Sequence, residues 1–413
     1  MTDSQTGGTL RQFRNAGRLG RAAPASRPQL QGVNIQDAGA HNRNVILHAI
    51  RANAPIARRD LAERTGLTPP AVFKITKILL EEGLVIGTRV RDGGMGQPPS
   101  MLMINKDAAF TLGLNIDRDH LTLVALDFAG QVRARFRRDV SYAGKGRVRA
   151  FFQDCVEQLQ RGGEIPMSKI AGIGLAAPDA LDRPFPMPSD LDLAWSLNSW
   201  RSALSGLVDV PIFHENDATA AAIGEMLFGA GLEAGSFFYL FMSVGLGGGL
   251  VVNRQYIRGA NGHGGEIGIW PQINPFRSSR TDLCRSLEDH VSLSGLRVAL
   301  GAAGFADPFT EGFDWAAPAV AACVDDWISG CADLLYAPLL SVICALDPDA
   351  ILVGGQLPGP ITQRLCHEVS KRLSLTIGTN WPKMAVRPGM LTVEPAAVGA
   401  AVLAFKEIWE PVA

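Results

Sequence analysis

Strands and helices alternate through most of the chain, and this alternation limits the possible fold more than any other feature. From about Lys106 onward, apolar segments of strand length are separated by glycine turns or by segments whose apolar residues recur at helical spacing. The strand segments include "FTLGLNI", "LTLVALDFAG", "IAGIGLAAP" and "DAILVGGQL", whereas "VRAFFQDCVEQLQ" is helical. This order predicts an α/β fold. Residues 106–413 exceed the size of one ordinary core, so we expect two lobes with a cleft between them.

Residues 41–105 show a different pattern, with three helical segments followed by two strands. "NVILHAIRA" and "ARRDLAERTG" predict short amphipathic helices, and Gly66 ends the second. The third helix, in "LTPPAVFKITKILLEEGLV", has Thr68 as its N-cap, Pro69 at its first position and Gly83 just beyond its end. Two strands flank "RDGGMGQPPS". The pattern predicts a winged helix-turn-helix domain over residues 41–105.

The third helix has an apolar side and a basic side. The predicted buried stripe is Val72, Ile75 and Leu79, with Ile78 beside it. The basic side can reach phosphates or base edges in a major groove. The candidate DNA-binding residues are Thr68, Pro70, Ala71, Lys74, Lys77, Arg89 and Arg91. The wing tip, residues 93–98, has no arginine for a minor groove, so the two strand arginines are expected to contact phosphates. A three-helix packing module that binds no DNA is the alternative.

Charge is unevenly distributed along the chain. Residues 1–100 contain 14 Lys and Arg against 7 Asp and Glu, whereas the remainder contains 25 against 33. A basic N-terminal part followed by an acidic remainder favours a polyanionic partner such as double-stranded DNA, although a merely solvated basic surface would have the same composition. Residues 1–40 are rich in Gly, Ala, Arg, Gln and Ser without periodicity, which predicts a disordered arm.

Composition also bears on the cellular compartment. The first residues lack the apolar segment of a secretion signal, and the most apolar stretches are interrupted by Gly, Pro or charge. The six cysteines are scattered and form no C-x-x-C pair. This spacing indicates reduced thiols rather than disulfides or a zinc cage. We therefore expect a cytoplasmic location and no membrane partner.

Six motifs, in order, resemble those of the ROK family of repressors, open reading frames and kinases. They are "GLNIDRDHLTLVALDFAGQV", "GIGLAAPDALD", "HENDATAAAIGE", "VGLGGGLVVNRQYIRGANGHGGEIG", "CRSLEDHVS" and "ILVGGQL". The resemblance covers the chain from about His41 to its end. It implies a two-lobed, actin-like ATPase fold over residues 106–413. Family members are sugar kinases or sugar-responsive transcription regulators, and the regulators carry an N-terminal winged helix-turn-helix.

The phosphate-binding loops of the family's kinases are altered in this chain. Where kinases have Asp-x-Gly-Gly-Thr, residues 115–120 read Asn-Ile-Asp-Arg-Asp-His, and an ordinary polar hairpin is expected. In the second loop, residues 243–249, Val244 replaces a hydroxyl residue, while the later glycines could persist for tight packing. Gly354 and Gly355, where the family often contacts adenosine, remain as a turn. We expect no bound cofactor, although a weak residual ATP site stays open.

The zinc element of the family is also missing. Ile269 stands where the family has a histidine, and Cys284 is the single cysteine of the segment that follows. One thiol cannot build a tetrahedral structural site, so no metal is expected. His263 and His290 are interpreted as ordinary surface histidines.

The resemblance further implies a sugar-facing site formed by Asn216, Asp217, Glu266 and Glu288. Carboxylates and amides suit sugars because they accept hydrogen bonds from adjacent hydroxyls. Asp179 would line the same cleft, in the place of the glycine in the family's Pro-Gly pair. Because of this change and of Ile269, the ligand need not be a glucose-like sugar, or a sugar at all.

Asp217 has three interpretations. It corresponds to the catalytic base of the family's kinases, yet a base needs a phosphoryl donor beside it. The altered loops therefore favour a hydrogen-bond acceptor for a ligand, with no catalytic residue in the chain. A third interpretation is that Asp217 only caps the helix "ATAAAIGEMLF".

These features predict a DNA-binding transcription regulator of carbohydrate metabolism, expected to be a repressor, that a small carbohydrate-like effector controls. We expect a homo-oligomer, a dimer or a tetramer, on a double-stranded operator. An ATP-dependent, glucokinase-like sugar kinase with an appended DNA-binding domain is the alternative from another class. A regulator without a small-molecule ligand is a third possibility.

Overall fold

The computed structural model describes residues 35–89, 100–140, 143–178, 203–204, 206–271, 286–310, 312–377 and 384–409. The chain divides into two compact units. The first unit comprises residues 1–175, 182–214 and 401–413, and the second comprises residues 176–181 and 215–400. Asp179, Arg91, Cys284 and the wing tip lie outside the described residues.

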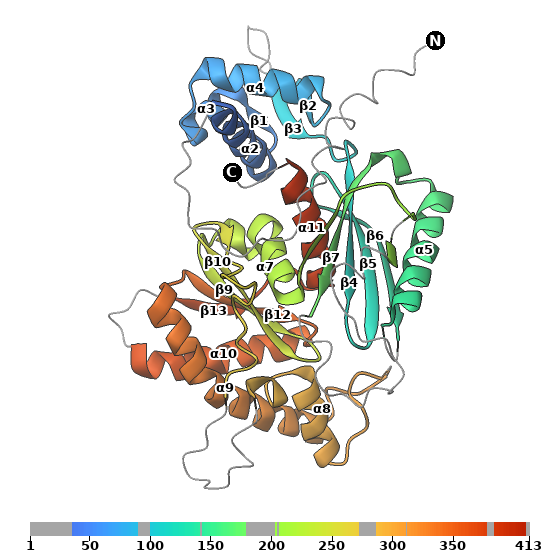
Figure 1. Cartoon of the computed structure of the whole chain (residues 1–413). Helices are drawn as coiled ribbons and strands as arrows, with labels where there is room; N and C mark the ends of the chain where they lie inside the picture. Colours follow the sequence, from blue (N-terminus) through green and yellow to red (C-terminus); the bar gives the residue numbers. More distant parts are fainter. Residues whose placement is uncertain are drawn as a thin grey trace. The chain divides into compact units, whose positions relative to one another are not determined.

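The predicted winged helix-turn-helix is present in the first unit (Figure 1). Its helices are α2 (Ile35–Asn53), α3 (Arg58–Thr65) and α4 (Pro69–Glu81). Its antiparallel sheet has the order β1 (Ile56–Ala57), β3 (Ser100–Ile104), β2 (Val85–Arg89). Helix α2 begins inside the segment predicted to be a disordered arm, and residues 1–34 lie outside the described part of the chain.

The predicted boundaries of α4 are confirmed. Thr68 is the N-cap, although its side chain makes no capping hydrogen bond, and Pro69 is the first helical residue. Gly66 and Gly83 adopt positive φ angles of 68° and 71°, which glycine tolerates and which end α3 and α4.

The buried side of α4 differs from the predicted stripe. Val72 and Leu79 are fully buried, as expected, and Thr76 joins them at 0% exposure. Ile78, in contrast, is 39% exposed. Thr76 can be buried because its hydroxyl accepts a hydrogen bond from Arg58 and donates to the backbone oxygen of Phe73. Hydrophobicity alone does not reveal a threonine that is satisfied in this way.

The core of the winged-helix module continues into the rest of the first unit. Ile46, Ile50 and Leu61 share one apolar cluster with Phe128 and with two residues near the end of the chain, Phe405 and Trp409. The aromatic ring centroids of Phe128, Phe405 and Trp409 lie 5.0 Å apart in each pair. The guanidinium of Arg51 lies 4.5 Å from the ring centroid of Phe405. The module is therefore anchored by α11 (Pro395–Trp409).

The first unit also contains a five-stranded sheet with the order β6-β5-β4-β7-β8. The strands are β4 (Phe110–Ile116), β5 (His120–Asp127), β6 (Val132–Asp139), β7 (Ile170–Ala177) and β8 (Ile212–Asn216). Strands β4, β5 and β6 form an antiparallel meander, and α5 (Lys145–Gly162) packs on β5 and β6. The short 3-10 helix η1 (Met167–Lys169) leads into β7.

The second unit is built on a mixed sheet with the order β11-β10-β9-β12-β13. The strands are β9 (Phe237–Met242), β10 (Leu246–Val252), β11 (Gln255–Tyr256), β12 (Ala350–Gly355) and β13 (Ala385–Pro388). Helix α7 (Asp217–Phe228), followed by η2 (Ala230–Leu232), packs on β9 and β10. Helices α8 (Leu293–Ala302), α9 (Pro318–Leu346) and α10 (Gly359–Ile377) share the other core of this unit with alternate residues of β9, namely Phe238, Leu240 and Met242.

Among the described helices, α9 is long and apolar enough, by length and composition, to cross a membrane. Its side chains have another use. Val324, Ile328, Leu335 and Leu339 are all buried in the core of the second unit, and α9 lies along α10 (Figure 1). We interpret α9 as a core helix of a layered α/β unit.

Candidate functional site

The first part of the candidate effector site is the junction between β8 and α7. Asn216 is the N-cap of α7, and its Oδ1 accepts hydrogen bonds from the backbone nitrogens of Ala218 and Thr219, at 2.9 and 3.3 Å. Asp217 is the first helical residue, and its Oδ1 accepts from the same Ala218 nitrogen at 2.8 Å. Both side chains are buried. Asn216 is thus the N-cap residue, and Asp217 adds a second acceptor at the same end of the helix. The positive end of α7 favours a carboxylate at this position.

Glu266 is brought to the same unit by the loop that follows β11. Gly265 has a φ of 97° and lies so close to the backbone of Gly248 in β10 that a Cβ atom on either glycine would clash with the other. The backbone nitrogen of Gly264 donates to the oxygen of Arg258 at 2.8 Å, which folds the loop on itself. Glu266 is half-buried. These backbone contacts explain why the loop needs glycine at positions 264 and 265.

An ion pair that the sequence did not suggest joins this loop to the β8–α7 junction. The Nε of Arg258 lies 2.9 Å from Oε2 of Glu215, the residue that precedes Asn216. The Glu215 side chain is almost fully buried, while Arg258 is about half exposed. The Oε1 of Glu215 accepts from the backbone nitrogen of Asn216 at 3.1 Å. The pair therefore connects two of the elements that carry candidate ligand-binding residues. In the sequence, Glu215 stands directly before Asn216, but nothing there indicated its partner.

Glu288 lies on the 3-10 helix η4 (Leu287–Asp289), which several contacts hold in place. Ser286 and Asp289 form a reciprocal capping box, and Leu287 is fully buried. The backbone nitrogen of Glu288 donates to the oxygen of Gly268 at 3.0 Å. This bond links η4 to the segment that carries Glu266.

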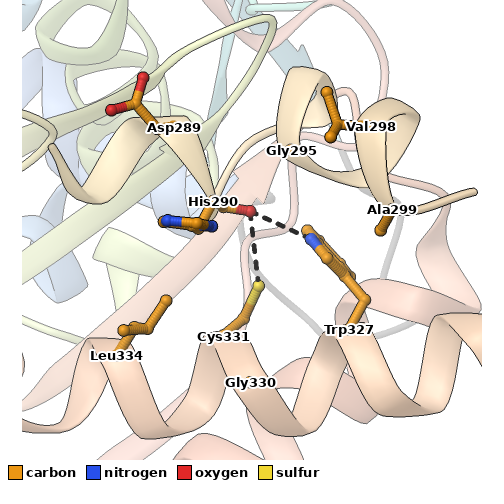
Figure 2. A pocket seen from close by; sticks show the side chains of 9 residues that line it. All are labelled: Asp289, His290, Gly295, Val298, Ala299, Trp327, Gly330, Cys331 and Leu334. Atoms are coloured by element: carbon orange, nitrogen blue, oxygen red, sulfur yellow. Dashed lines mark hydrogen bonds between the residues drawn. The ribbon is translucent and has the colours of Figure 1, made fainter. Parts of the chain in front are cut away.

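Helix α9 contacts the residue that follows η4, His290 (Figure 2). The indole Nε1 of Trp327 donates to the backbone oxygen of His290 at 3.0 Å, and the thiol of Cys331 lies 3.8 Å from the same oxygen. Burial raises the pKa of the Cys331 thiol well above its usual range, so the group remains a neutral donor. An open cavity of about 520 Å³ lies here, lined by residues of η4, α8 and α9. None of the four predicted sugar-facing residues lines it, so we do not assign it to the effector.

The retained glycines of the second phosphate loop are in a strand rather than in a turn. Gly247, Gly248 and Gly249 belong to β10 and pair with Phe241, Leu240 and Tyr239 of β9. A Cβ atom on Gly247 would lie 2.7 Å from the Cβ of Ala218 in α7. These glycines therefore allow α7 and the Glu266 loop to approach the sheet, as tight packing would require.

The glycine pair at the end of β12 has a similar role. A Cβ atom on Gly354 would overlap the hydroxyl of Tyr239, and Gly355 has a φ of 116° and contacts the backbone of Met242. Tyr239 is fully buried, which raises the pKa of its hydroxyl well above its usual value. The pair is thus required by packing within the second unit.

The first phosphate loop is replaced by a tight polar hairpin, as predicted. Residues 115 and 116 end β4, His120 begins β5, and the backbone nitrogen of Asp117 donates to the oxygen of His120 at 3.0 Å. The Nδ1 of His120 lies 2.7 Å from Oδ1 of Asp119, and Asp117 accepts from the backbone nitrogen of Arg118 at 2.7 Å. The turn is thus held by hydrogen bonds of its own polar side chains.

Within the described part of the chain, Asp117, Asp119 and His120 form the group whose side chains could hold a metal ion, because their possible ligand atoms lie within 4.8 Å of one another. Burial disfavours the charged form of His120, but the hydrogen bond that its ring donates to Asp119 and the negative charge of Asp117 outweigh burial and raise the pKa of His120. The local hydrogen bonds account for Asp117, Asp119 and His120 without an ion. Ile269, at the family's histidine position, is 51% exposed.

The predicted DNA-binding residues occupy the exposed side of α4 and its approach. Thr68, Pro70, Lys74 and Lys77 are exposed, and Ala71 is half-buried. Lys77 forms an exposed pair with Glu81, at 3.7 Å. Arg89 ends β2 opposite Ser100. The structure adds Phe73, an exposed residue on the same side of α4, and Arg58, which lies beside it. The spacing of Phe73 from Val72 and Leu79 already excluded it from the buried stripe.

Comparison with known proteins is consistent with this architecture. Residues 111–303 match the ROK family, and residues 41–86 match a winged helix-turn-helix DNA-binding domain. The protein y4fQ of Sinorhizobium fredii is 27% identical over 88% of this chain and 90% of its own length. The xylose repressor of Bacillus subtilis is 28% identical over 55% of this chain, and the match spans 59% of the repressor.

A solved structure extends the comparison over nearly the whole fold. The crystal structure of a ROK family transcriptional regulator, a homolog of the Escherichia coli MLC protein, has a TM-score of 0.64 and 21% identity. The alignment covers 91% of this chain and 97% of that one. At this identity the likeness shows the fold. Together with the two family matches, it shows that this chain carries a ROK family domain, with the actin-like sugar kinase fold, behind an N-terminal winged helix-turn-helix.

Proposed function

We propose that this protein is a sugar-responsive transcriptional repressor whose ROK domain binds the effector and does not transfer phosphate. One observation carries the proposal. Neighbouring residues occupy the space beside the glycines that would contact a nucleotide. In contrast, hydrogen bonds and an ion pair hold the elements that carry the proposed sugar-binding residues. Ala218 and Ala222 of α7 pack directly on Gly247 and Gly249. The proposed sugar-binding residues lie on elements of the second unit that other contacts hold in place, namely Asn216, Asp217, Glu266 and Glu288.

The chemistry of these four residues suits a polyhydroxylated effector. Carboxylates accept hydrogen bonds from adjacent hydroxyls. The side-chain oxygen of Asn216 is used in the helix cap, and its amide NH2 group adds a donor. A ligand without the matching hydroxyls would leave buried acceptors unpaired, and this penalty provides selectivity. We also propose Asp179 as a ligand-binding residue. The names of similar proteins, a xylose repressor and the N-acetylglucosamine repressor of Escherichia coli, support a carbohydrate effector.

The proposed DNA-binding surface is the exposed face of α4. Lys74 and Lys77 would contact phosphates, and the neutral N-terminal residues Thr68 and Pro70 would lie against base edges. We propose that Arg89 and Arg91 contact phosphates beside the wing. A homodimer or tetramer would present two such modules to an operator with two half-sites. A regulator of this kind works in the cytoplasm, where it meets chromosomal DNA.

The test is DNA binding by the purified protein, measured as fluorescence anisotropy on duplexes from upstream of its own and neighbouring genes. We expect a specific complex that one compound weakens, from a panel of sugars, sugar phosphates and polyols added without ATP. A complex that no compound alters would refute the sugar-responsive part of the proposal. No specific complex at low and moderate salt would refute the regulator.

A variant pair separates the two halves of the proposal. Lys74→Ala with Lys77→Ala should weaken binding and lower the slope of log K against log salt by up to about 2. The charge-matched double variant Lys145→Ala with Lys371→Ala, on α5 and α10, should leave that slope unchanged.

A sugar kinase is the competing function, and Asp217 favours it, because it stands where the family's kinases have their catalytic base. The same panel should therefore be assayed for sugar-dependent ATP turnover. Turnover that Asp217→Asn abolishes would establish the kinase and overturn the assignment of Asp217 as a binding residue only.

A further inference from the structure

Phe73 is the most unusual residue on the proposed DNA-binding face. It is 58% exposed, although the removal of a phenylalanine side chain from water is favourable. Of its four neighbours on the helix surface, at spacings of three and four residues, Pro69, Pro70 and Lys77 are exposed and Thr76 is buried. The ring is therefore exposed where the exposed side of α4 meets its buried side, next to Lys77 and the two prolines.

The ring is also held in one orientation. The guanidinium of Arg58 lies 5.5 Å from the ring centroid of Phe73. Arg58 is itself fixed, because its Nε donates to the hydroxyl of the buried Thr76 at 2.8 Å, and this hydroxyl donates to the backbone oxygen of Phe73 at 3.2 Å. One face of the ring is thus backed by a cation that is anchored in the core of the module.

Charge around the ring indicates its partner. Arg58 lies over the ring of Phe73, Lys77 follows one helical turn later and Lys74 is the next residue, so this apolar side chain has a cationic rim beside it. A duplex major groove has the complementary arrangement, with phosphates along its edges and the 5-methyl group of thymine as the apolar feature of its floor. An apolar protein partner would not match the cationic rim.

We propose that Phe73 reads the 5-methyl group of a thymine in each operator half-site, with Arg58 orienting the ring. The proposal rests on the DNA-binding function proposed above and assigns a sequence preference to it. Contact with one methyl group removes about as much apolar surface as burying one CH2 unit, which corresponds to roughly a fourfold change in affinity per half-site.

The experiment removes the methyl group alone. Binding sites are first selected by the purified protein from a pool of randomised duplexes. Each thymine of the enriched duplex is then replaced singly by deoxyuridine, which lacks the 5-methyl group and keeps the same base pairing. We expect affinity to fall about fourfold at one thymine in each half-site and to remain unchanged at the others.

Variants identify the side chain that reads the methyl group. Phe73→Ser should bind the thymine and deoxyuridine duplexes equally, while Phe73→Leu should keep part of the difference. Ile78→Ser, which removes an exposed apolar residue from the other flank of α4, is the matched control and should keep the full difference. Arg58→Ala should reduce the difference in affinity between the thymine and deoxyuridine duplexes, because the Phe73 ring then samples other rotamers.

The outcomes are distinct. Wild-type affinity that no deoxyuridine substitution changes would overturn the proposal, and so would a Phe73→Ser variant that keeps the wild-type sensitivity. A pool without any enriched sequence would instead overturn the DNA-binding function itself. Because Phe73 is exposed, thermal unfolding of Phe73→Ser should match the wild type, so a change in DNA binding reports on the contact.

Discussion

Gly249 of β10 and Ala222 of α7 lie so close that a Cβ atom on the glycine would be 2.5 Å from the Cβ of the alanine. The neighbouring pair, Gly247 and Ala218, has the same relationship at 2.7 Å. Both distances are shorter than two carbon atoms tolerate, and both glycines lie in a paired strand that cannot shift alone. A motif that resembles a phosphate loop is thus maintained by the packing of a helix on a sheet.

This contact leads to a first prediction about stability. Gly249→Ala and Gly247→Ala should each lower the free energy of unfolding by about 1–3 kcal/mol, because the added methyl group overpacks the α7–β10 interface. The measurement is urea unfolding followed by circular dichroism. Gly301→Ala in α8, where an added Cβ meets nothing within 4 Å, is the control and should be neutral or stabilising.

A compensating change makes the interpretation specific. Ala218→Gly removes the methyl group that Gly247→Ala would strike, so the double variant should recover part of the lost stability. If Gly247→Ala left the unfolding free energy unchanged, packing would not explain why the glycine is kept.

The two residues at the start of α7 should respond differently to substitution. Asn216→Ala removes the cap of α7 and should cost about 1 kcal/mol of stability. Asp217→Asn keeps the shape and should change stability little, yet it should abolish the effector's influence on DNA binding while leaving DNA affinity intact. Anisotropy titrations with and without the effector measure both quantities. Unchanged effector sensitivity in Asp217→Asn would remove Asp217 from the site.

The Glu215–Arg258 ion pair should matter for effector affinity. Removing Arg258 deprives a buried carboxylate of this partner and frees the loop that carries Glu266. We expect Arg258→Ala to weaken effector binding by about tenfold, a loss of about 1.4 kcal/mol, with DNA affinity unchanged. A double-mutant cycle with Glu215→Gln, measured by calorimetric titration of the effector, should show coupling between the two residues. Additive losses would indicate that they act separately.

Much of this architecture could be predicted from the sequence because local signals agreed with the fold. Thr68, Pro69 and Gly83 mark the ends of α4, and the structure places them there. The polar hairpin at residues 115–120 was also correctly predicted, since its side chains exclude a glycine turn. Periodicity failed at Thr76, whose burial depends on a hydrogen bond from Arg58, 18 residues away. Contacts between distant residues leave no local signal.

The candidate site shows the same division. Asn216, Asp217, Glu266 and Glu288 were predicted from motifs, but the ion pair of Glu215 with Arg258 depends on how a loop folds back on a strand end. The packing role of the β10 glycines was foreseen as one option, yet the partners that fill the space, Ala218 and Ala222, become known only from the structure.

The raised pKa of His120 predicts a pH dependence. A raised pKa in the folded state means that the protonated form stabilises the fold. This contribution is complete below the unfolded pKa of about 6.5 and is lost as the pH rises through the higher folded value. The difference in unfolding free energy between wild type and His120→Gln should therefore decrease from pH 6 to pH 8. Urea unfolding at several pH values tests this, and a difference that is flat or that increases with pH would contradict it.

The anchoring of the winged-helix module on α11 leads to a last prediction. Arg51 lies over Phe405, and Trp409 packs on Phe128, so the last turns of α11 are part of the core of the module. Trp409→Ala should cost on the order of 3 kcal/mol of stability in the first unit. The same helix begins in the second unit, where Gly399 contacts the backbone of Ala220 in α7.

Because α11 belongs to both units, its anchored end offers a covalent route from the proposed effector site to the winged-helix module. We expect Arg51→Met, which keeps the apolar stem and removes the charge over Phe405, to leave DNA affinity intact and to reduce the effector's influence on it. Arg59→Ala, an exposed residue of α3, is the control and should keep the full effector response. Anisotropy titrations compare the three proteins. An effector response in Arg51→Met equal to that of the wild type would show that this contact carries no part of the coupling.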